Sequence, residues 1–304
     1  MLTLYYCDHH GFPLAEGHKF PLRKYALLRA MLAAEGLFAF EPAPLATADE
    51  VSAVHDREYV EDFASGALAP AAMRRIGFQW SPELVTRTFA SAGSTIAAAR
   101  MAVRTGFGGT LAGGTHHAFR AEGSGFCVFN DIAVAIHAMG RPRAAVIDLD
   151  VHQGDGTAKI FEGDGHVLTL SLHGRNNFPF RKQVSSIDVE FADGTGDDEY
   201  LEALAAALPR VAEFGPEIVF YQSGVDGLKE DRLGKLALTH EGLMRRDAMV
   251  FELARGLSTP IVVTLGGGYA DPIEATVRAH ANTFRLAASV VFQGSVSARL
   301  DDGR

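Results

Sequence analysis

The stretch Ala144–Gly156 reads AAVIDLDVHQGDG, a short apolar run followed at once by acidic and imidazole side chains. Such a run is typical of a buried parallel strand. Alternate side chains of a strand face the same way, so Asp148, Asp150 and His152 would project together if the strand continues. Carboxylate oxygen and imidazole nitrogen suit Zn, Fe or Mn. Helix capping by single aspartates is the alternative, but three polar residues at a spacing of two favour a metal site.

Four further runs share this apolar, β-branched character, and Ala-rich stretches separate them. They span Leu2–Tyr6, Val167–Leu172, Ile218–Gln222 and Ile261–Leu265. Strands that alternate with helices in this way indicate a parallel sheet. The sequence therefore predicts an α/β fold with a central, mostly parallel sheet and helices on both faces.

Helix starts are marked by two local signals. Thr47 and Glu50 have the spacing of a capping box, and Ser81 followed by Pro82 precedes an Ala-rich run to about Arg104. Both signals predict helices between the run Leu2–Tyr6 and the run that begins at Ala144.

The composition indicates one large core. The chain has 304 residues, of which 47% are hydrophobic and 21% charged, which excludes intrinsic disorder. No Pro- or Ser-rich linker and no internal repeat divides it. We therefore expect a single domain over residues 1–304, ending in a polar tail at about residues 295–304.

Charge and cysteine usage restrict the partners. Lys and Arg total 28 against 37 Asp and Glu, a formal charge of -9 without a basic run, so nucleic acid is not an expected partner. Cys7 and Cys127 cannot form a disulfide framework, and the first ten residues do not read as a signal peptide. No apolar stretch reaches 18 residues, so we expect a cytoplasmic protein with no membrane contact.

Asp226 is the candidate for a third metal ligand. It follows the apolar run Ile218–Gln222, and ligands of α/β sheets bind beyond the carboxyl ends of strands. An aspartate between glycines is also a common turn former. An Asp, His, Asp set would neutralise a divalent ion and acidify bound water less than three histidines would. Such a site should need a separate general base.

Adjacent histidines supply that base. His116 and His117 follow Gly113-Gly114-Thr115 after another short apolar stretch. The alternative is that the two histidines are adjacent by chance on the surface and have no function. Their internal position and the flanking glycines favour a general base with an electrostatic partner. A catalytic histidine normally has its far nitrogen held by a carboxylate, for which Asp148 and Asp155 are candidates.

A triple glycine ends the last apolar run. Three glycines, Gly266–Gly268, precede Tyr269, whose hydroxyl could donate to a developing oxyanion. A glycine-rich turn with a packing tyrosine is the alternative. A phosphate cradle is disfavoured, because neither a Walker lysine nor a GxGxxG fingerprint lies nearby.

Together these motifs resemble the histone deacetylase family of the arginase-deacetylase fold, from about His18 to Tyr269. The motifs are GGTHHAF (113–119), SGFCVFND (124–131), VIDLDVHQGDG (146–156), GVDGLKEDRLGKLALT (224–239) and LGGGY (265–269). Some pieces are most similar to class IV deacetylases and their bacterial relatives, namely HKFP (18–21), DVHQGDG (150–156), DGTGDDEYL (193–201) and EDRLGKL (230–236).

The resemblance implies a zinc-dependent amidohydrolase that removes an acyl group, acetyl or longer, from acyl-lysine. Metal-activated water would attack, with a tandem-histidine general base and acid and a tyrosine oxyanion donor. It implies one Zn2+ per chain, with Fe2+ as an alternative. The residues carried over are Asp150, His152 and Asp226 as metal ligands, His116 and His117 as the tandem histidines, Asp148 and Asp155 as their carboxylate partners, and Tyr269 as the catalytic tyrosine. Which histidine is the base stays open.

Two further features come only from the resemblance. Gly125 and Phe126 match one wall of a narrow acyl-lysine channel, and Phe178 matches the other. A monovalent cation, K+, would bind near the zinc, largely through backbone oxygens, at Asp148, Asp150, His152, Ser171 and Leu172.

The chain departs from the related dinuclear manganese hydrolases such as arginases. Gly154 and Gly224 stand where those enzymes carry additional carboxylates, so no second metal is expected. Asp155 is Asn in some class IV relatives, and the aspartate here favours a more basic His117.

The expected partner is an acylated lysine peptide or protein, or an acylated small amine such as an acetylpolyamine. An acidic protein suits cationic substrates of either size. A non-catalytic acyl-lysine binding protein is a third alternative, which the complete set of site residues disfavours. The sequence holds no signal for the oligomeric state.

Overall fold

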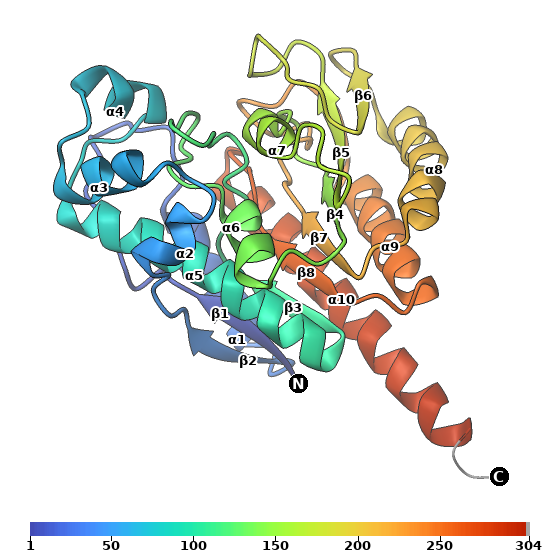
Figure 1. Ribbon diagram of the computed structural model, residues 1–304. Coiled ribbons are helices and arrows are strands. Elements are labelled where there is room, and N and C mark those ends of the chain that lie inside the picture. Colours follow the sequence, from blue (N-terminus) through green and yellow to red (C-terminus); the bar gives the residue numbers. More distant parts are fainter. Residues whose placement is uncertain (302–304) are drawn as a thin grey trace.

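Eight parallel strands form one sheet in the computed structural model, which describes the backbone of residues 1–301 and the side chains of residues 1–290. Their order across the sheet is β2-β1-β3-β8-β7-β4-β5-β6 (Figure 1). The strands are β1 (Leu2–Tyr6), β2 (Phe38–Pro42), β3 (Phe107–Thr110), β4 (Ala144–Asp148), β5 (Val167–Gly174), β6 (Ile187–Phe191), β7 (Ile218–Gln222) and β8 (Ile261–Thr264).

All five strands expected from the sequence are confirmed, and the parallel α/β fold with them. The sequence did not indicate β2, β3 and β6. The edge strands β2 and β6 carry too few β-branched apolar residues, and β3 reads FGGT. Glycine is required in β3, because a Cβ atom at Gly108 would overlap the backbone of Ala98.

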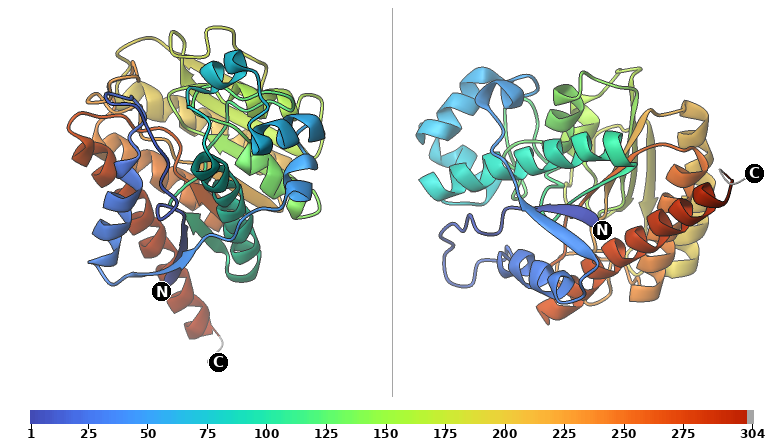
Figure 2. Two further views of the ribbon diagram at one scale, coloured as in Figure 1. Left: turned by 90° about the vertical axis from the view of Figure 1, so that its left-hand side faces the viewer. Right: turned by 90° about the horizontal axis from the view of Figure 1, so that it is seen from below.

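Helices cover both faces of the sheet (Figures 1 and 2). One face packs against α1 (Arg23–Ala33), α8 (Asp197–Phe214), α9 (His240–Gly256) and α10 (Ile273–Asp301). The other packs against α2 (Ala48–Ser52), α3 (Arg57–Ser65), α4 (Pro70–Ile76), α5 (Pro82–Thr105), α6 (Asp131–Ala138) and α7 (Asp155–Ile160). The arrangement is a single three-layer domain.

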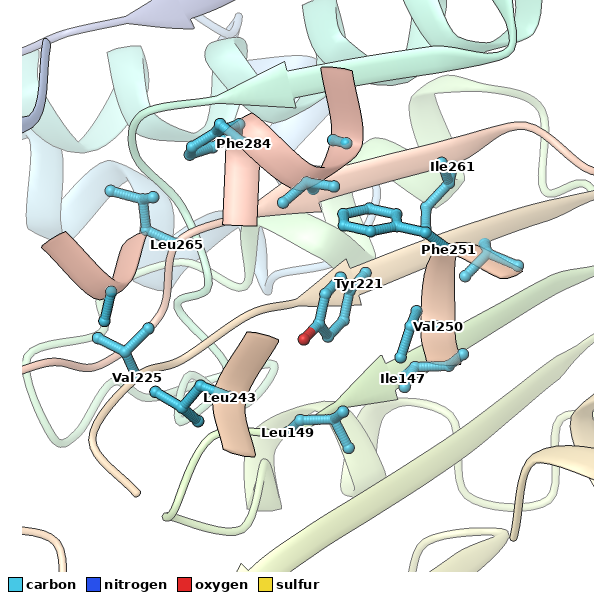
Figure 3. Close-up of a cluster of buried hydrophobic side chains, with 14 of the residues drawn as sticks. Ile147, Leu149, Tyr221, Val225, Leu243, Val250, Phe251, Ile261, Leu265 and Phe284 are labelled. Carbon is cyan, nitrogen blue, oxygen red and sulfur yellow. The ribbon is translucent and has the colours of Figure 1, made fainter. Parts of the chain in front are cut away.

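Alternation along the central strands creates two cores. In β7, Val219 and Tyr221 join the core beneath α9 and α10, whereas Phe220 joins the core beneath α5 and α6. Figure 3 shows Tyr221 beside Val250 and Phe251 of α9. Each fully buried aliphatic or aromatic side chain contributes about 1.5–3 kcal/mol, so both faces are strongly anchored.

The helix signals are confirmed. Thr47 and Glu50 form the reciprocal hydrogen bonds of a capping box, and the Ser81 hydroxyl accepts from Leu84 N at the start of α5. At the other end of the chain, α10 includes residues 295–301 of the segment expected as a polar tail. Residues 302–304 lie outside the described part.

Strand order explains how distant motifs meet. β3, β8, β7 and β4 are consecutive neighbours, and each is followed by one of the polar clusters. Parallel strands end at the same edge, so the tandem histidines, the triple glycine, Asp226 and the segment Asp148–Asp155 converge there.

Candidate metal and catalytic site

The loop after β4 bends at residues 150–152. The strand ends at Asp148, so the expected continuation of the strand to His152 is wrong. Side-chain bonds within the loop replace the strand pattern: Asp148 Oδ1 accepts from Asp150 N at 3.2 Å, and Asp150 Oδ1 accepts from His152 N at 3.0 Å. As a result Asp148 separates from the other two, which point toward Asp226.

Asp150, His152 and Asp226 form the candidate metal site. One ligand atom from each lies within 4.8 Å of the others, and no other described residues form such a group of three. Nδ1 of His152 lies 3.0 Å from a carboxylate oxygen of each aspartate. The remaining oxygens accept backbone N–H groups, from Gly267 to Asp150 Oδ2 at 2.6 Å and from Val151 to Asp226 Oδ1 at 2.9 Å.

The charges of this group fit a divalent cation. All three side chains are buried, and burial together with the nearby Asp150 carboxylate raises the pKa of Asp226 to about 7. Two desolvated carboxylates repel each other unless a positive charge lies between them. Two oxygens and one nitrogen are ligands that zinc accepts, with a fourth position left for water or substrate.

There is no room for the carboxylates of a second metal site. A Cβ atom at Gly224 would overlap the Asp150 carboxylate. One at Gly154 would overlap the Asp148 carboxylate and approach His116 Nδ1 to 3.2 Å. Carboxylate side chains therefore do not fit at positions 154 and 224 of this site.

The tandem histidines have separate carboxylate partners. His116 Nδ1 lies 2.7 Å from Asp148 Oδ2, and His117 Nδ1 lies 2.6 Å from Asp155 Oδ1. Their Nε2 atoms are 3.1 Å apart, and all four side chains are buried. The structure thus pairs both histidines with the carboxylates that the sequence suggested.

Their surroundings shift the pKa values of the two histidines in opposite directions. Burial opposes the protonated form of His116, but the Asp148 and Asp150 carboxylates outweigh it and raise its pKa to about 9. Burial and the neighbouring His116 lower the pKa of His117 to about 4, despite Asp155. At neutral pH His117 is therefore the histidine able to accept a proton.

A cavity of about 400 Å³ opens onto these groups. Its lining includes Gly125, Phe126, Phe178 and Tyr269, the four residues expected at the channel and oxyanion positions. The Phe178 ring stands edge-on to the His117 ring, with ring centroids 4.9 Å apart. The ring centroids of Phe126 and Tyr269 are 6.3 Å apart. Gly125 has φ +53°, and a Cβ atom there would press on Phe178 at 3.1 Å and more closely on His117.

Tyr269 is held in its protonated form. Burial and the Asp226 carboxylate raise the pKa of the phenol well above its usual value. The backbone at this position is anchored by Asp231, whose Oδ2 accepts from Tyr269 N at 2.6 Å. The phenol is therefore a hydrogen-bond donor on the cavity wall.

Two of the residues expected around a monovalent cation are neighbours in the sheet. Ser171 pairs with Asp148 across β5 and β4, and both are buried, as is Leu172. The Ser171 hydroxyl lies 3.0 Å from His173 Nδ1.

Lys24 is a residue that the sequence did not indicate. Its ammonium group is buried, donates to the Gly266 carbonyl at 2.9 Å and lies 5.6 Å from the Tyr269 ring centre. Burial lowers its pKa to about 8. A lysine at the start of an amphipathic helix carries no local signal of this placement.

Asp131 was likewise missed, although it lies in a quoted motif. It accepts from the backbone N–H groups of Gly114 and Thr115, at 3.1 and 2.7 Å, and from the hydroxyls of Thr115 and Thr95, both at 2.6 Å. These four bonds fix the loop that carries the tandem histidines.

Comparison with known proteins agrees with the family that the sequence motifs resemble. A family model described as histone deacetylase domain matches residues 18–285. An uncharacterized protein of Picosynechococcus is 41% identical over 91% of this chain and 95% of its own length. Histone deacetylase 2 of Arabidopsis thaliana is 32% identical over 83% of this chain and 70% of its own length. A probable deacetylase of Methanothermobacter thermautotrophicus is 31% identical over 82% of this chain and 80% of its own length.

A solved structure supports the fold. The crystal structure of the HDA15 HD domain superposes with a TM-score of 0.78 at 24% identity, over 95% of this chain and 88% of that one. The shared architecture is the arginase-deacetylase fold.

Fold, site and sequence matches together define a deacetylase, a class of hydrolase that generally depends on a metal ion. The chain belongs to the histone deacetylase family, as its motifs predicted. In the described part of the chain both cysteines are free, and no helix has the length and apolar character to cross a membrane.

Proposed function

We propose that the protein is a zinc-dependent amidohydrolase that removes an acyl group, acetyl or longer, from the side-chain amine of acyl-lysine. The observation that carries the proposal is the meeting of three parts at one cavity. Its wall includes Asp150 and His152 of the cluster that Asp226 completes, the tandem histidines, and Tyr269. The three residues of the cluster would hold the ion. A bound zinc ion supplies Lewis acidity that polarises the acyl carbonyl and lowers the pKa of water.

The roles of the remaining residues follow from their protonation states. His117 is neutral and accepts the proton of the attacking water, with its far nitrogen oriented by Asp155. The Asp148 carboxylate lies 2.7 Å from His116 Nδ1 and favours the protonated, positively charged form of that imidazole next to the reacting centre. The Tyr269 hydroxyl donates to the oxygen that becomes negative as the carbonyl carbon is attacked. The proton then passes from the histidine pair to the departing amine.

The cavity favours acyl-lysine over an acylated polyamine. Among the described residues that line it, Asp150 alone is acidic, whereas Lys24, Arg75 and Arg87 are basic. A polyamine would bring additional positive charges toward these three cations. An acyl-lysine side chain is neutral, and Phe126 and Phe178 in the cavity lining offer apolar surface to its methylene chain.

The test is purified protein loaded with one equivalent of zinc and assayed on lysine peptides carrying acyl groups from acetyl to myristoyl, with N-acetylspermidine in parallel. We expect turnover of at least one peptide and much weaker activity on the polyamine. Hydrolysis of the polyamine alone would favour the small-molecule alternative. Stoichiometric zinc without hydrolysis of any substrate would favour a binding protein.

We also propose K+ as a second ion, at the site formed by Asp148, Asp150, His152, Ser171 and Leu172. Support comes from the adjacency of Asp148 and Ser171 across β4 and β5. Activity at constant ionic strength should differ between KCl and NaCl. Identical rates in both salts would contradict a selective site.

A further inference from the structure

Arg246 is a buried cation for which the proposed mechanism has no role. It lies on α9, its side chain is fully buried, and it is absent from the cavity lining. An arginine removed from water must be paired, so its partners indicate what it does.

One nitrogen of this guanidinium bridges two segments of the chain. Nη1 donates to the carbonyl of Leu149 at 3.2 Å and to the carbonyl of Gly224 at 2.7 Å. Leu149 directly precedes the candidate ligand Asp150, and Gly224 lies two residues before the candidate ligand Asp226. The two segments that present the carboxylates are therefore tied to one planar group.

The opposite side of the guanidinium is anchored. Nε donates to Asp247 Oδ1 at 2.9 Å, and Nη2 lies 2.8 Å from the same oxygen. Asp247 in turn accepts from the Tyr221 hydroxyl at 2.5 Å and from the Thr283 hydroxyl at 2.6 Å. Figure 3 shows the Tyr221 ring beside α9, within the core between the sheet and this helix. The Arg246 side chain is thus fixed by strand β7 and by helices α9 and α10.

We propose that Arg246 is a positioning residue for the metal site, which sets the separation of the Asp150 and Asp226 segments before the ion binds. The proposal rests on the proposed metal function. Without an ion the two carboxylates repel each other, and the Arg246 bridge holds their backbones together against that repulsion. The close packing of Gly224 against Asp150 requires the same spacing, since a single added carbon would not fit. Outer groups that orient metal ligands commonly change metal affinity by about 10- to 100-fold.

The experiment compares zinc affinity in four forms of the full chain: wild type, Arg246→Met, Arg246→Lys and Arg285→Met. Arg285 is the control, because it forms a bidentate ion pair with Glu35 between α10 and the end of α1, and neither residue lines the cavity. Metal-free protein is titrated with zinc against a chromophoric chelator. Unfolding of the metal-free forms in urea is measured separately, and the absorption spectrum of the Co2+-loaded forms reports ligand geometry.

We expect Arg246→Met to weaken zinc binding by about 10- to 100-fold and to change the cobalt spectrum. Arg246→Lys keeps the positive charge but loses the planar guanidinium that donates to both segments. It should therefore weaken zinc binding by a smaller factor than Arg246→Met does. Arg285→Met should bind zinc as the wild type does, whatever its stability in urea. Wild-type zinc affinity and an unchanged cobalt spectrum in Arg246→Met would overturn the inference. If Arg246→Met does not fold, wild-type zinc affinity and an unchanged cobalt spectrum in Arg246→Lys would overturn the inference. A wild type that binds no zinc would instead refute the proposed function.

Discussion

Nδ1 of His117 lies 2.6 Å from Oδ1 of Asp155, and both side chains are buried. This contact leaves Nε2 of His117 as the nitrogen available for proton transfer. It also gives His117 a different partner from that of His116, because Asp155 begins helix α7 whereas Asp148 ends strand β4.

The first prediction concerns this pair. Asp155→Asn should remove the charge that partly offsets the lowering of the His117 pKa and orients its ring, and so lower kcat by about 10- to 100-fold with little change in KM. Steady-state kinetics on an acyl-lysine peptide measure both constants. The zinc content should remain at one equivalent, and an unchanged kcat would exclude Asp155 as the orienting group.

The second prediction concerns the oxyanion donor. Tyr269→Phe should lower kcat by about 100- to 1,000-fold, because one donor to the developing charge is lost. The phenyl ring can keep its packing beside Phe126, so zinc affinity and thermal stability should not change. Metal analysis and a thermal melt provide these controls. Full activity in the variant would assign the donor role to another group.

The third prediction concerns metal removal. Dialysis against dipicolinate should abolish activity and lower Tm, since an ion that binds only the folded state stabilises it by mass action. Zn2+ should restore both, whereas Mg2+ should not, because its octahedral preference does not match two carboxylates and an imidazole. Activity that survives complete metal removal would contradict the metal mechanism.

The fourth prediction tests the lack of space beside the metal ligands. Gly224→Ala should displace the Asp150 carboxylate and lower zinc affinity, as measured by chelator competition. The matched control is Gly256→Ala at the end of α9, where an added Cβ meets nothing within 4 Å. That variant should bind zinc normally and gain up to about 1 kcal/mol of stability. Equal zinc affinity in both variants would refute the packing argument.

The fifth prediction concerns acid stability through a histidine outside the site. His55 is buried, lies 2.8 Å from the Phe119 carbonyl through Nδ1 and accepts from Asn130 N at 2.9 Å through Nε2. Burial lowers its pKa from 6.5 to about 4. Between these values only the unfolded chain binds the proton, so the free energy of unfolding falls as pH falls, by about 1.4 kcal/mol per pH unit.

Urea unfolding of wild type and His55→Gln between pH 7.5 and pH 5 measures this contribution. The variant should be less stable at pH 7.5 but should show a shallower loss toward pH 5. Parallel curves for the two proteins would mean that His55 does not contribute to the pH dependence.

The central strands and the site motifs could be predicted from the sequence for a common physical reason. A strand buried on both faces, such as β4 or β7, must be apolar throughout, and the first polar residues after it mark the sheet edge. That placement marked Asp148, Asp150, His152 and Asp226 as candidates, and the family resemblance implied the set Asp150, His152 and Asp226. The prediction was wrong about how these side chains come together. A hydrogen bond within the loop, and not a continued strand, orients His152.

Other features depend on contacts between distant segments. Lys24 and Arg246 lie on helices whose local sequence is ordinary, and each becomes important through carbonyl groups far away in the chain. The strand β3 reads as a glycine-rich turn until α5 is packed against it.

The sequence by itself determined the parallel α/β class, the family and the identity of the residues at the strand ends, because these depend on local hydrophobic pattern and motif spacing. The tertiary structure decided the contacts of each histidine, and hence why the pKa of His116 is raised and that of His117 is lowered. It also decided that Arg246 joins the two ligand segments. Such pairings depend on strand order and on burial, which change the free energy of a charge only after the chain has folded.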